Sequence, residues 1–421
     1  METLQIGGVS SRTLADQYGT PLYVYDENKI KQQASAAAKN FASDKFDTEV
    51  VYASKAFSCA ALFKMLAGEG LGFDVVSGGE LYCAIRVGAD MKKVYFHGNN
   101  KSDEEIEMGL DAGVGYFVID NVMECERIIK LAEKKKACTK ALLRINPGIS
   151  AHTHEYIMTA TPNSKFGIHI DDDENIGDVI RMLSESEYVT MAGFHSHIGS
   201  QIVDCCSFEK ALGTMIDFLS DMKASYGLDN MELSIGGGFG IKYVESDAPV
   251  SLGHMCRKLV AYAEKALENS DVTLRKLITE PGRAMVGEAG YTLYTIGDMK
   301  ESGDKNYIFV DGGMSDNIRH ALYDAEYTGV LAEKYGMPEE ETYCIAGKNC
   351  ESGDVLIEEM QLPKAEPGDI LAVFSTGAYG YSMASNYNRL GRPAVVFAGN
   401  GRARSVIRRE TYEDQYRLEV V

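Results

Sequence analysis

The chain has 421 residues, 45% of them hydrophobic and 25% charged, which is the balance of a folded enzyme large enough for two domains. Its formal net charge of −20 argues against nucleic acid or an anionic membrane surface as a partner. No signal segment opens the sequence, and no run approaches the ~18 apolar residues of a membrane span. Nine cysteines without a CxxC pair indicate reduced thiols. We therefore expect a cytoplasmic protein.

The first three fifths of the chain predict a barrel. Residues 1–26 hold a helical pattern, Ser11–Tyr18, and a strand-like segment, Leu22–Tyr25. From residue 27, short apolar runs alternate with stretches of helical period. The strands expected there are Val50–Ser54, Gly72–Ser77, Val94–His97, Tyr116–Ile119, Ala141–Ile145, Lys165–Ile168, Met191–Ser196, Leu233–Gly236 and Leu277–Glu280. The expected helices include Glu27–Phe41, Ala60–Ala67, Gly79–Val87, Asp103–Ala112, Met123–Lys135 and Phe208–Tyr226. Roughly eight strand–helix units over about 250 residues fit a (β/α)₈ barrel, with a doubly wound open sheet as the alternative.

After Arg283 the pattern changes to strands at irregular spacing, separated by Gly, Asp and Pro. The strands expected there are Ala289–Asp298, Asn306–Asp311, Thr342–Ala346, Asp369–Ser375 and Ala394–Ala398. They predict a mostly antiparallel β domain that also takes in the N-terminal strand. The expected fold class is therefore α/β plus β, with an N-terminal segment 1–26, a barrel 27–283 and a C-terminal β domain 284–421.

Reactive side chains follow several of the expected strands, where catalytic groups of such barrels lie. Lys55 comes directly after the first strand, and burial there would lower its pKa and leave the amine able to form a Schiff base. The alternative is a lysine that reaches the surface from a strand end. Asp74 lies in the second strand. In a later strand exit, His197 could stack on an aromatic ring, while His195 could be an ordinary core histidine.

Two further strand exits suit an anion and a heterocycle. Successive N–H groups of the glycines Gly236, Gly237 and Gly238 can converge on a phosphate, although a tight turn alone would also explain them. Without GxGxxG spacing or GK[ST], a single phosphate is expected rather than a nucleotide. At the last exit, Glu280 could keep a heterocyclic nitrogen protonated, or could form a structural ion pair with Arg283.

Other candidates lie outside these exits. The segment Ala151–Glu155 superficially resembles a metal cluster, but no CxxC or HExxH supports it, and no metal site is expected. In the second domain, Arg319 and Tyr323 are spaced to share one helix face. Loops there carry Cys350–Asp354 and Gly377–Tyr381. Two arginines, an acid and a phenol suit a small substrate with a distal carboxylate and a distal ammonium.

These segments, taken together in order and spacing, resemble the diaminopimelate decarboxylases, a family of fold-type III pyridoxal-phosphate enzymes with an alanine-racemase-like barrel and a C-terminal β domain. The likeness extends from Gly19 to Asn388. It rests on the segments YASKAF, GFDVVSGGEL, RINPG, AHTHEY, SKFGIH, HSHIGSQI, GGGFGI, EPGR, NIRHALYDAEY, CESGDVL and GAYGYSMASNYN.

The resemblance implies pyridoxal 5'-phosphate as the cofactor. Lys55 resembles the Schiff-base lysine, His197 the ring-stacking residue and Glu280 the partner of the pyridine nitrogen. Residues implied to bind the cofactor are Lys55, Asp74, His197, Ser200, Gly236, Gly237, Gly238, Glu280, Gly282, Arg283 and Tyr379. Residues implied to hold the substrate are Arg283, Arg319, Tyr323, Glu351 and Tyr379. Cys350 resembles the residue that protonates the carbanion, on a loop that serves the neighbouring subunit, which implies a homodimer with shared active sites.

The reaction implied is decarboxylation of meso-2,6-diaminopimelate to L-lysine and CO₂, the last step of lysine biosynthesis via diaminopimelate. Several alternatives stay open. A racemase on the same barrel is disfavoured by Glu280, since alanine racemases place an arginine at the pyridine nitrogen. Decarboxylases of ornithine, arginine or lysine would not need two distal arginines. A carrier-bound or modified amino acid, and a degenerate homologue that binds the cofactor without catalysis, are the remaining alternatives.

Overall fold

The computed structural model describes residues 3–149 and 164–420, and the chain divides into two compact units. Unit 1 comprises Met1–Gln32, Ile241–Ala248 and Met285–Val421, and unit 2 comprises Gln33–Gly240 and Pro249–Ala284. The domains 1–26, 27–283 and 284–421 stay a proposal, and the compact units differ from them in assigning Ile241–Ala248 to the unit that holds both chain ends. No helix in the described ranges is both long and apolar enough to span a membrane.

Unit 2 is a closed barrel of eight parallel strands. The barrel strands are β4 (Asp47–Ala53), β5 (Gly72–Val75), β6 (Val94–Phe96), β7 (Tyr116–Ile119), β8 (Thr139–Asn146), β10 (Val189–Ser196), β11 (Met231–Ser234) and β12 (Leu274–Thr279). Each pairs with the next, β12 pairs with β4, and β10 pairs with both β8 and β11, so the sheet has no open edge. The expected barrel is confirmed, and the open-sheet alternative is wrong.

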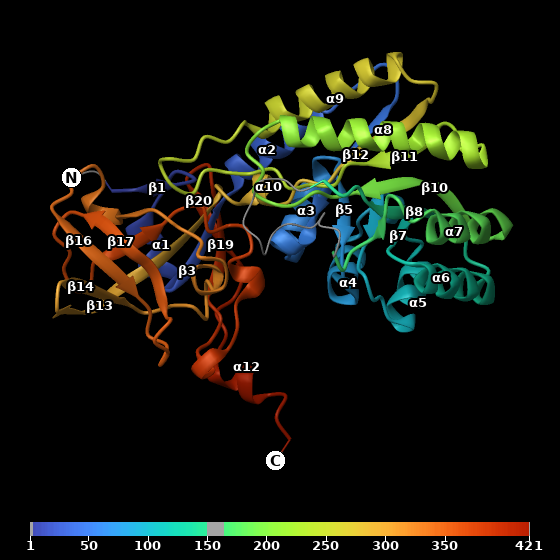
Figure 1. The fold of residues 1–421 in the computed structure, drawn as a ribbon. Helices are drawn as coiled ribbons and strands as arrows, with labels where there is room; N and C mark the ends of the chain where they lie inside the picture. The colour runs from blue at the N-terminus through green and yellow to red at the C-terminus, as the bar shows by residue number, and fades with distance from the viewer. Residues whose placement is uncertain (1–2, 150–163, 421) are drawn as a thin grey trace. The chain divides into compact units, whose positions relative to one another are not determined.

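Helices alternate with the barrel strands along the chain, the first of them ahead of β4. They are α2 (Glu27–Asn40), α3 (Ala60–Gly68), α4 (Gly78–Val87), α5 (Asp103–Ala112), α6 (Val122–Lys135), α7 (Asp173–Glu185), α8 (Cys206–Tyr226) and α9 (Leu252–Glu268). Helices α5 to α8 lie on the outside of the strands (Figure 1). Local signals set their bounds: Ser102 and Glu105 form a capping box at the start of α5, and Gly113 ends it in the left-handed conformation.

One expected barrel strand is wrong. Of the expected strand Lys165–Ile168, only Ile168 is extended. It belongs to the two-residue strand β9 (Ile168–His169), which pairs with β8 outside the closed barrel. Gly167 has φ +73° and donates its N–H to Asp120 Oδ1 at 3.0 Å, so the backbone turns where the strand was expected. Residues 150–163, which include the segment Ala151–Glu155, lie outside the described residues.

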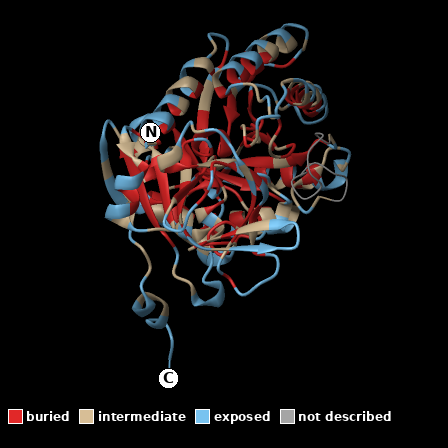
Figure 2. Ribbon diagram, turned by 90° about the vertical axis from the view of Figure 1, so that its left-hand side faces the viewer, coloured by how far each residue is buried: buried red, intermediate tan, exposed pale blue. Residues whose placement is uncertain are grey.

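The barrel interior has an apolar layer between two polar ends. Its members are Val51, Tyr95, Tyr116, Val118, Leu142, Ala192 and Ile278. Figure 2 shows that the strands are mostly buried, whereas the outer helix faces are exposed. Gly193 lies at a register shift in β10, where a Cβ would come within 1.8 Å of Glu232 O, so only glycine lets these strands approach.

Unit 1 is a mostly antiparallel sheet, as expected, and the N-terminal strand belongs to it. The order is β17-β16-β14-β13-β3-β19-β20, with β18 paired to β13 and β15. Strand β3 (Leu22–Asp26) lies antiparallel to β13 and parallel to β19. The other strands are β13 (Gly290–Ser302), β14 (Lys305–Val310), β15 (Gly329–Leu331), β16 (Glu341–Ala346), β17 (Val355–Leu362), β18 (Ile370–Val373), β19 (Ala394–Gly399) and β20 (Arg402–Ile407). A hairpin, β1 (Gln5–Ile6) with β2 (Val9–Ser10), and three short helices, α1 (Ser11–Tyr18), α11 (Arg319–Tyr323) and α12 (Tyr412–Tyr416), complete the unit.

Candidate active site

Lys55 lies at the C-terminal end of β4, in the single 3₁₀ turn Ser54–Ala56. Tyr52 donates its hydroxyl to Phe57 O at 2.8 Å and so pins the turn. Lys55 is exposed in the chain, so the expected burial of this lysine is wrong. Its neighbours in the same turn, Ser54 and Ala56, are buried, so the side chain of residue 55 alone is directed out of the packed strand end.

Asp74, on the neighbouring strand β5, is 2% exposed. Burial raises the pKa of its carboxyl, and the charges of His97 and Lys55 oppose that shift. Asp74 and Lys55 therefore lie within electrostatic reach of each other, as expected for two members of one site.

Glu280 follows β12 directly and is held by side chains from three other strand ends. Its Oε1 accepts a hydrogen bond from Ser234 Oγ at 2.8 Å, and its Oε2 lies 3.1 Å from His195 Nε2. His97 Nε2 lies between two carboxylates, 3.4 Å from Glu280 Oε1 and 3.8 Å from Asp74 Oδ1. Because an ionised carboxylate only accepts hydrogen bonds, Nε2 of His195 carries the hydrogen.

Glu280 is ionised at neutral pH. Burial lowers the pKa of His195 to about 4, so its imidazole is neutral at pH 7. Burial alone would raise the pKa of Glu280, but the attraction of His195 and His97 holds that pKa well below its usual range. The lowered pKa of His195 and the lowered pKa of Glu280 are consistent with each other. As the pH falls, the imidazole of His195 takes up a proton before the carboxylate of Glu280 does.

The glycine turn after β11 requires glycine for steric reasons. Gly236 has φ +65° and Gly238 has φ +113°, and a Cβ on Gly237 would lie 2.1 Å from Glu280 O. Within the described part of the chain, the N–H groups of Gly237 and Gly238 donate to no protein acceptor. The turn thus places two backbone donors at the barrel mouth, which suits an anion.

His197, directly after β10, packs beside this turn. A Cβ on Gly236 would lie 2.9 Å from His197 Nδ1, so the missing side chain leaves room for the imidazole. Burial, followed by repulsion from Lys55 and Arg144, lowers the pKa of His197 well below its usual range. His197 is therefore a neutral ring at pH 7, as a stacking residue should be.

Ser200 and Arg283 lie together: Arg283 Nη2 donates to Ser200 Oγ at 2.9 Å. Arg283 begins the short helix α10 (Arg283–Val286) and is 5% exposed. Gly282 packs tightly against the strand before Lys55, since a Cβ there would lie 3.1 Å from Ala53 O. The barrel unit thus brings together every predicted site residue that it contains.

The remaining predicted residues lie in unit 1. Arg319 and Tyr323 share helix α11, as expected. Arg319 is 7% exposed and donates from Nη1 to the hydroxyls of Tyr327 at 2.7 Å and Tyr243 at 3.0 Å. Burial opposes its charge, but the two phenols outweigh burial and raise the pKa of Arg319. It is a fixed cation without a carboxylate partner within 4 Å among the described residues.

Cys350 and Glu351 are exposed on the loop between β16 and β17. Asp354 anchors this loop by accepting N–H hydrogen bonds from Asn349 at 2.7 Å and Met314 at 2.6 Å. Asn388 Oδ1 accepts the Cys350 N–H at 2.7 Å.

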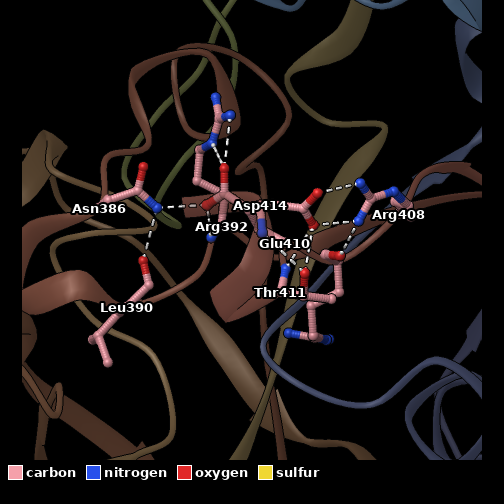
Figure 3. A network of polar contacts seen from close by, with 8 residues as sticks. Asn386, Leu390, Arg392, Arg408, Glu410, Thr411 and Asp414 are labelled. Carbon is pink, nitrogen blue, oxygen red and sulfur yellow. Dashed lines mark hydrogen bonds and ion pairs between the residues drawn. The ribbon is translucent and has the colours of Figure 1, made fainter. Parts of the chain in front are cut away.

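The segment that carries Asn388 is itself tied to the C-terminal residues (Figure 3). Glu410 accepts hydrogen bonds from Asn386 Nδ2 and from Arg392 Nη2, the latter at 3.0 Å. Asp414 pairs with Arg408 and caps α12. Tyr379 lies on a separate loop after β18 and has φ +59°, an uncommon conformation for a tyrosine. Strain of this kind often marks functional loops.

The sequence did not single out His97 or Ser234, and it left His195 as an ordinary core histidine. All three end barrel strands, and that position was the signal that could have found them. Two of these residues, His97 and His195, form a group with Glu280 in which three potential metal-ligand atoms lie within 4.8 Å of one another. The hydrogen bond of His195 and the 3.4 Å approach of His97 to Glu280 already account for this grouping.

Residues 27–287 match the model of the pyridoxal-dependent decarboxylase family, pyridoxal binding domain. Fold and site thus define the class: the chain is a pyridoxal-dependent decarboxylase of the barrel type.

Full-length comparisons narrow the class. The chain is 46% identical to the diaminopimelate decarboxylase of Halalkalibacterium halodurans over 99% of its own length and 95% of the relative's. It is 45% identical to that of Bacillus subtilis, with the same coverage. Diaminopimelate decarboxylase of M. jannaschii, solved with L-lysine, superposes with a TM-score of 0.93 at 35% identity, covering 100% of this chain and 96% of that chain. The chain belongs to the diaminopimelate decarboxylase family.

Proposed function

We propose that this protein catalyses the decarboxylation of meso-2,6-diaminopimelate to L-lysine and CO₂, the last step of lysine biosynthesis via diaminopimelate. The observation that carries the proposal is the 46% identity to a diaminopimelate decarboxylase over 99% of the chain, because that span includes both the barrel and the second unit. The L-lysine bound in a related structure corresponds to the proposed product.

The barrel mouth fits pyridoxal 5'-phosphate. Glu280 is a buried, ionised carboxylate with no lysine or arginine nitrogen within 4 Å among the described residues, which suits a protonated ring nitrogen. The N–H groups of Gly237 and Gly238 suit a phosphate. Lys55 is an exposed amine at the same strand ends, able to hold an aldehyde.

In the mechanism, Lys55 would hold the cofactor. Ser200 and the glycine turn would bind the cofactor's phosphate, and His197 would pack on the face of its ring. Bound there, pyridoxal 5'-phosphate would supply an electron sink for the charge that departing CO₂ leaves on the substrate. Glu280 keeps a fixed negative charge for the ring nitrogen, and Asp74 supports Lys55 electrostatically.

We further propose that Arg283 and Arg319 bind the distal carboxylate, that Glu351 binds the distal ammonium, and that Tyr323 and Tyr379 complete the substrate contacts. Cys350 would deliver the proton to the substrate carbon. Arginine suits the carboxylate because its planar fork can donate two parallel hydrogen bonds.

We also propose a homodimer in which the Cys350 loop completes the active site of the neighbouring subunit. In support, Cys350 and Glu351 are exposed in the single chain although the loop is firmly anchored through Asp354. All nine cysteines are free thiols, which supports a reducing compartment such as the cytoplasm.

The test is release of CO₂ from meso-2,6-diaminopimelate beside L-lysine and L-ornithine at equal concentration. We expect diaminopimelate to be preferred, because the proposal assigns Arg283 and Arg319 to a distal carboxylate that L-lysine and L-ornithine lack. Lys55→Ala is the control and should abolish turnover while leaving the barrel folded. Preference for L-lysine or L-ornithine, or normal turnover by Lys55→Ala, would contradict the proposal.

A further inference from the structure

The negative charge of Glu280 is buried without a permanent cation. Its carboxylate is 5% exposed, and its polar contacts are Ser234, His195 and His97. Ser234 and His97 both approach Oε1, whereas among the residues that the structure describes Oε2 has His195 as its one side-chain partner. Each carboxylate oxygen can accept about two hydrogen bonds, so Oε2 retains one acceptor position. The carboxylate can therefore accept a further donor at Oε2, such as a protonated ring nitrogen.

The two imidazoles are themselves held in place. Their rings lie edge to face, with centroids 4.9 Å apart and planes at 74°. His195 is part of β10, and the His97 backbone N–H donates to Val75 O at 2.8 Å, which fixes the residue after β6. Both side chains are buried, at 1% and 4% exposure. A carboxylate held by two such rings has little freedom to rotate.

We propose that His97 and His195 are positioning residues that hold Glu280 ionised and in one orientation for the ring nitrogen of the cofactor. This inference rests on the proposed function, since it takes Glu280 as the partner of that nitrogen. The neutral imidazole of His195 donates to Oε2, and His97 Nε2 lies 3.4 Å from Oε1, so the two rings can orient the carboxylate without a permanent cation that would cancel its charge. A lysine or arginine in the same place would neutralise Glu280.

The experiment measures how tightly the full chain, freed of cofactor, binds pyridoxal 5'-phosphate and its 1-deaza analogue, in which carbon replaces the ring nitrogen. The ratio of the two affinities reports the contact between Glu280 and the nitrogen. For the wild type we expect a preference for the natural cofactor of at least about tenfold, the value of one charge-assisted hydrogen bond. Glu280→Gln should abolish most of that preference.

The His97→Leu/His195→Leu double variant tests whether the two histidines position Glu280. We expect it to bind the analogue nearly as well as the wild type does and to lose most of the preference. His97→Gln and His195→Gln are the matched controls: glutamine keeps a donor close to the position of Nε2, so each should retain the preference. A double variant that binds both compounds equally weakly has lost structure, and that result overturns a positioning role.

A second measurement uses the holoenzyme. With ¹⁵N in the cofactor ring, the nitrogen chemical shift reports protonation directly. It should indicate a protonated ring in the wild type and in the glutamine variants, and a less protonated ring in the leucine double variant. An unchanged shift in the double variant refutes the inference.

The outcomes also separate this inference from the proposed function. If Glu280→Gln leaves the affinity ratio unchanged, Glu280 is not the ring partner and its role in the proposed function fails. If Glu280→Gln changes the affinity ratio but the His97→Leu/His195→Leu double variant does not, the positioning role of the histidines fails and the proposed function stands. A stoichiometric metal ion in the purified protein, lost on His97→Leu, would assign the cluster to metal binding and overturn it as well.

Discussion

At the N-terminal ends of the barrel strands, Glu232 is fully buried and lies 3.5 Å from Lys140 Nζ and 3.5 Å from Lys276 Nζ. At the C-terminal ends, Glu280 is almost equally buried, and its side-chain polar contacts within residues 3–149 and 164–420 are two histidines and a serine. The apolar layer inside the barrel separates the two. One buried carboxylate therefore has permanent cations beside it, and the other has none.

The N-terminal cluster joins its carboxylates to lysines and tyrosines of the protein itself. Lys276 Nζ lies 2.9 Å from Glu49 Oε2 and donates to the Tyr116 hydroxyl at 3.0 Å. Tyr95 donates to Glu49 at 2.7 Å, and its ring stacks on that of Tyr116 with centroids 4.2 Å apart. Burial opposes the charge of Lys276, but the hydrogen bonds with Tyr116 and Glu49 raise its pKa above the ordinary value. Both carboxylates of the cluster therefore have permanent cations beside them, and Arg275 Nε lies a further 3.7 Å from Glu232 Oε1, so we expect the cluster to have a structural role.

The difference shows how to distinguish structural from functional buried charge in one barrel. A closed network satisfies its own members, and breaking it costs stability. A carboxylate left with only neutral donors is completed by a ligand, so changing it costs ligand binding and catalysis instead.

The largest expected effect is that of Glu280→Gln on turnover. We expect kcat to fall by about 10³-fold because a neutral amide cannot hold the ring nitrogen protonated. The free energy of unfolding should fall only modestly, because the contacts that hold the pKa of Glu280 low also stabilise the folded carboxylate, and the amide oxygen of glutamine can keep one of them. CO₂ release and urea unfolding measure the two effects. A variant that is destabilised yet fully active would show that Glu280 belongs to a structural network after all.

Lys276→Met should produce the opposite result. It leaves Glu49 and Glu232 without their shared cation, and we expect a loss of about 3 kcal/mol in the free energy of unfolding. The kcat of the folded protein should not change. Lys140→Met is the control, because Lys140 is partly exposed and contacts Glu232 only at 3.5 Å, so its loss should be smaller. Equal losses for the two variants would refute the central role of Lys276.

The pH dependence of the free energy of unfolding tests whether His195 is buried in its neutral form at the C-terminal ends of the barrel strands. The pKa of His195 is lowered from 6.5 to about 4, so the unfolded chain binds more protons than the folded one in that window. Stability therefore falls as the pH drops from 6.5 towards 4, by an amount on the order of 2 kcal/mol. His195→Gln should flatten this fall. Asp316, whose pKa burial raises to about 7, contributes with the opposite sign, but equally in both proteins. Identical pH profiles would show that His195 is not buried in neutral form.

The smallest expected effect is that of Tyr95→Phe. The substitution removes one hydrogen bond to Glu49 and keeps the stacked ring, so we expect a loss of about 1 kcal/mol in unfolding free energy. Activity should be unaffected, and steady-state kinetics of CO₂ release check this. A change in kcat would link the two ends of the barrel and contradict their separation.

Much of the fold could be predicted because buried parallel strands are apolar on both faces. The runs at Val50, Gly72 and Tyr116 were found for that reason, and Lys55 and Glu280 were found because they end such runs. The expectation failed at Lys165–Ile168, where a left-handed glycine turns the chain. It also failed for the burial of Lys55, because this side chain is exposed in a 3₁₀ turn whose other two residues are buried.

The amino-acid sequence by itself determined the order of strands and helices, the ring of reactive residues at the strand ends and, through its motifs, the family. Only the tertiary structure decided which of the two buried carboxylates, Glu232 or Glu280, has lysines beside it. Glu280 and His195 are 85 positions apart, and Glu232 would pass in the sequence for an ordinary surface acid. Closure of the barrel between β8 and β10 brings these distant strand ends together, and contacts across a closed sheet leave no trace in local periodicity.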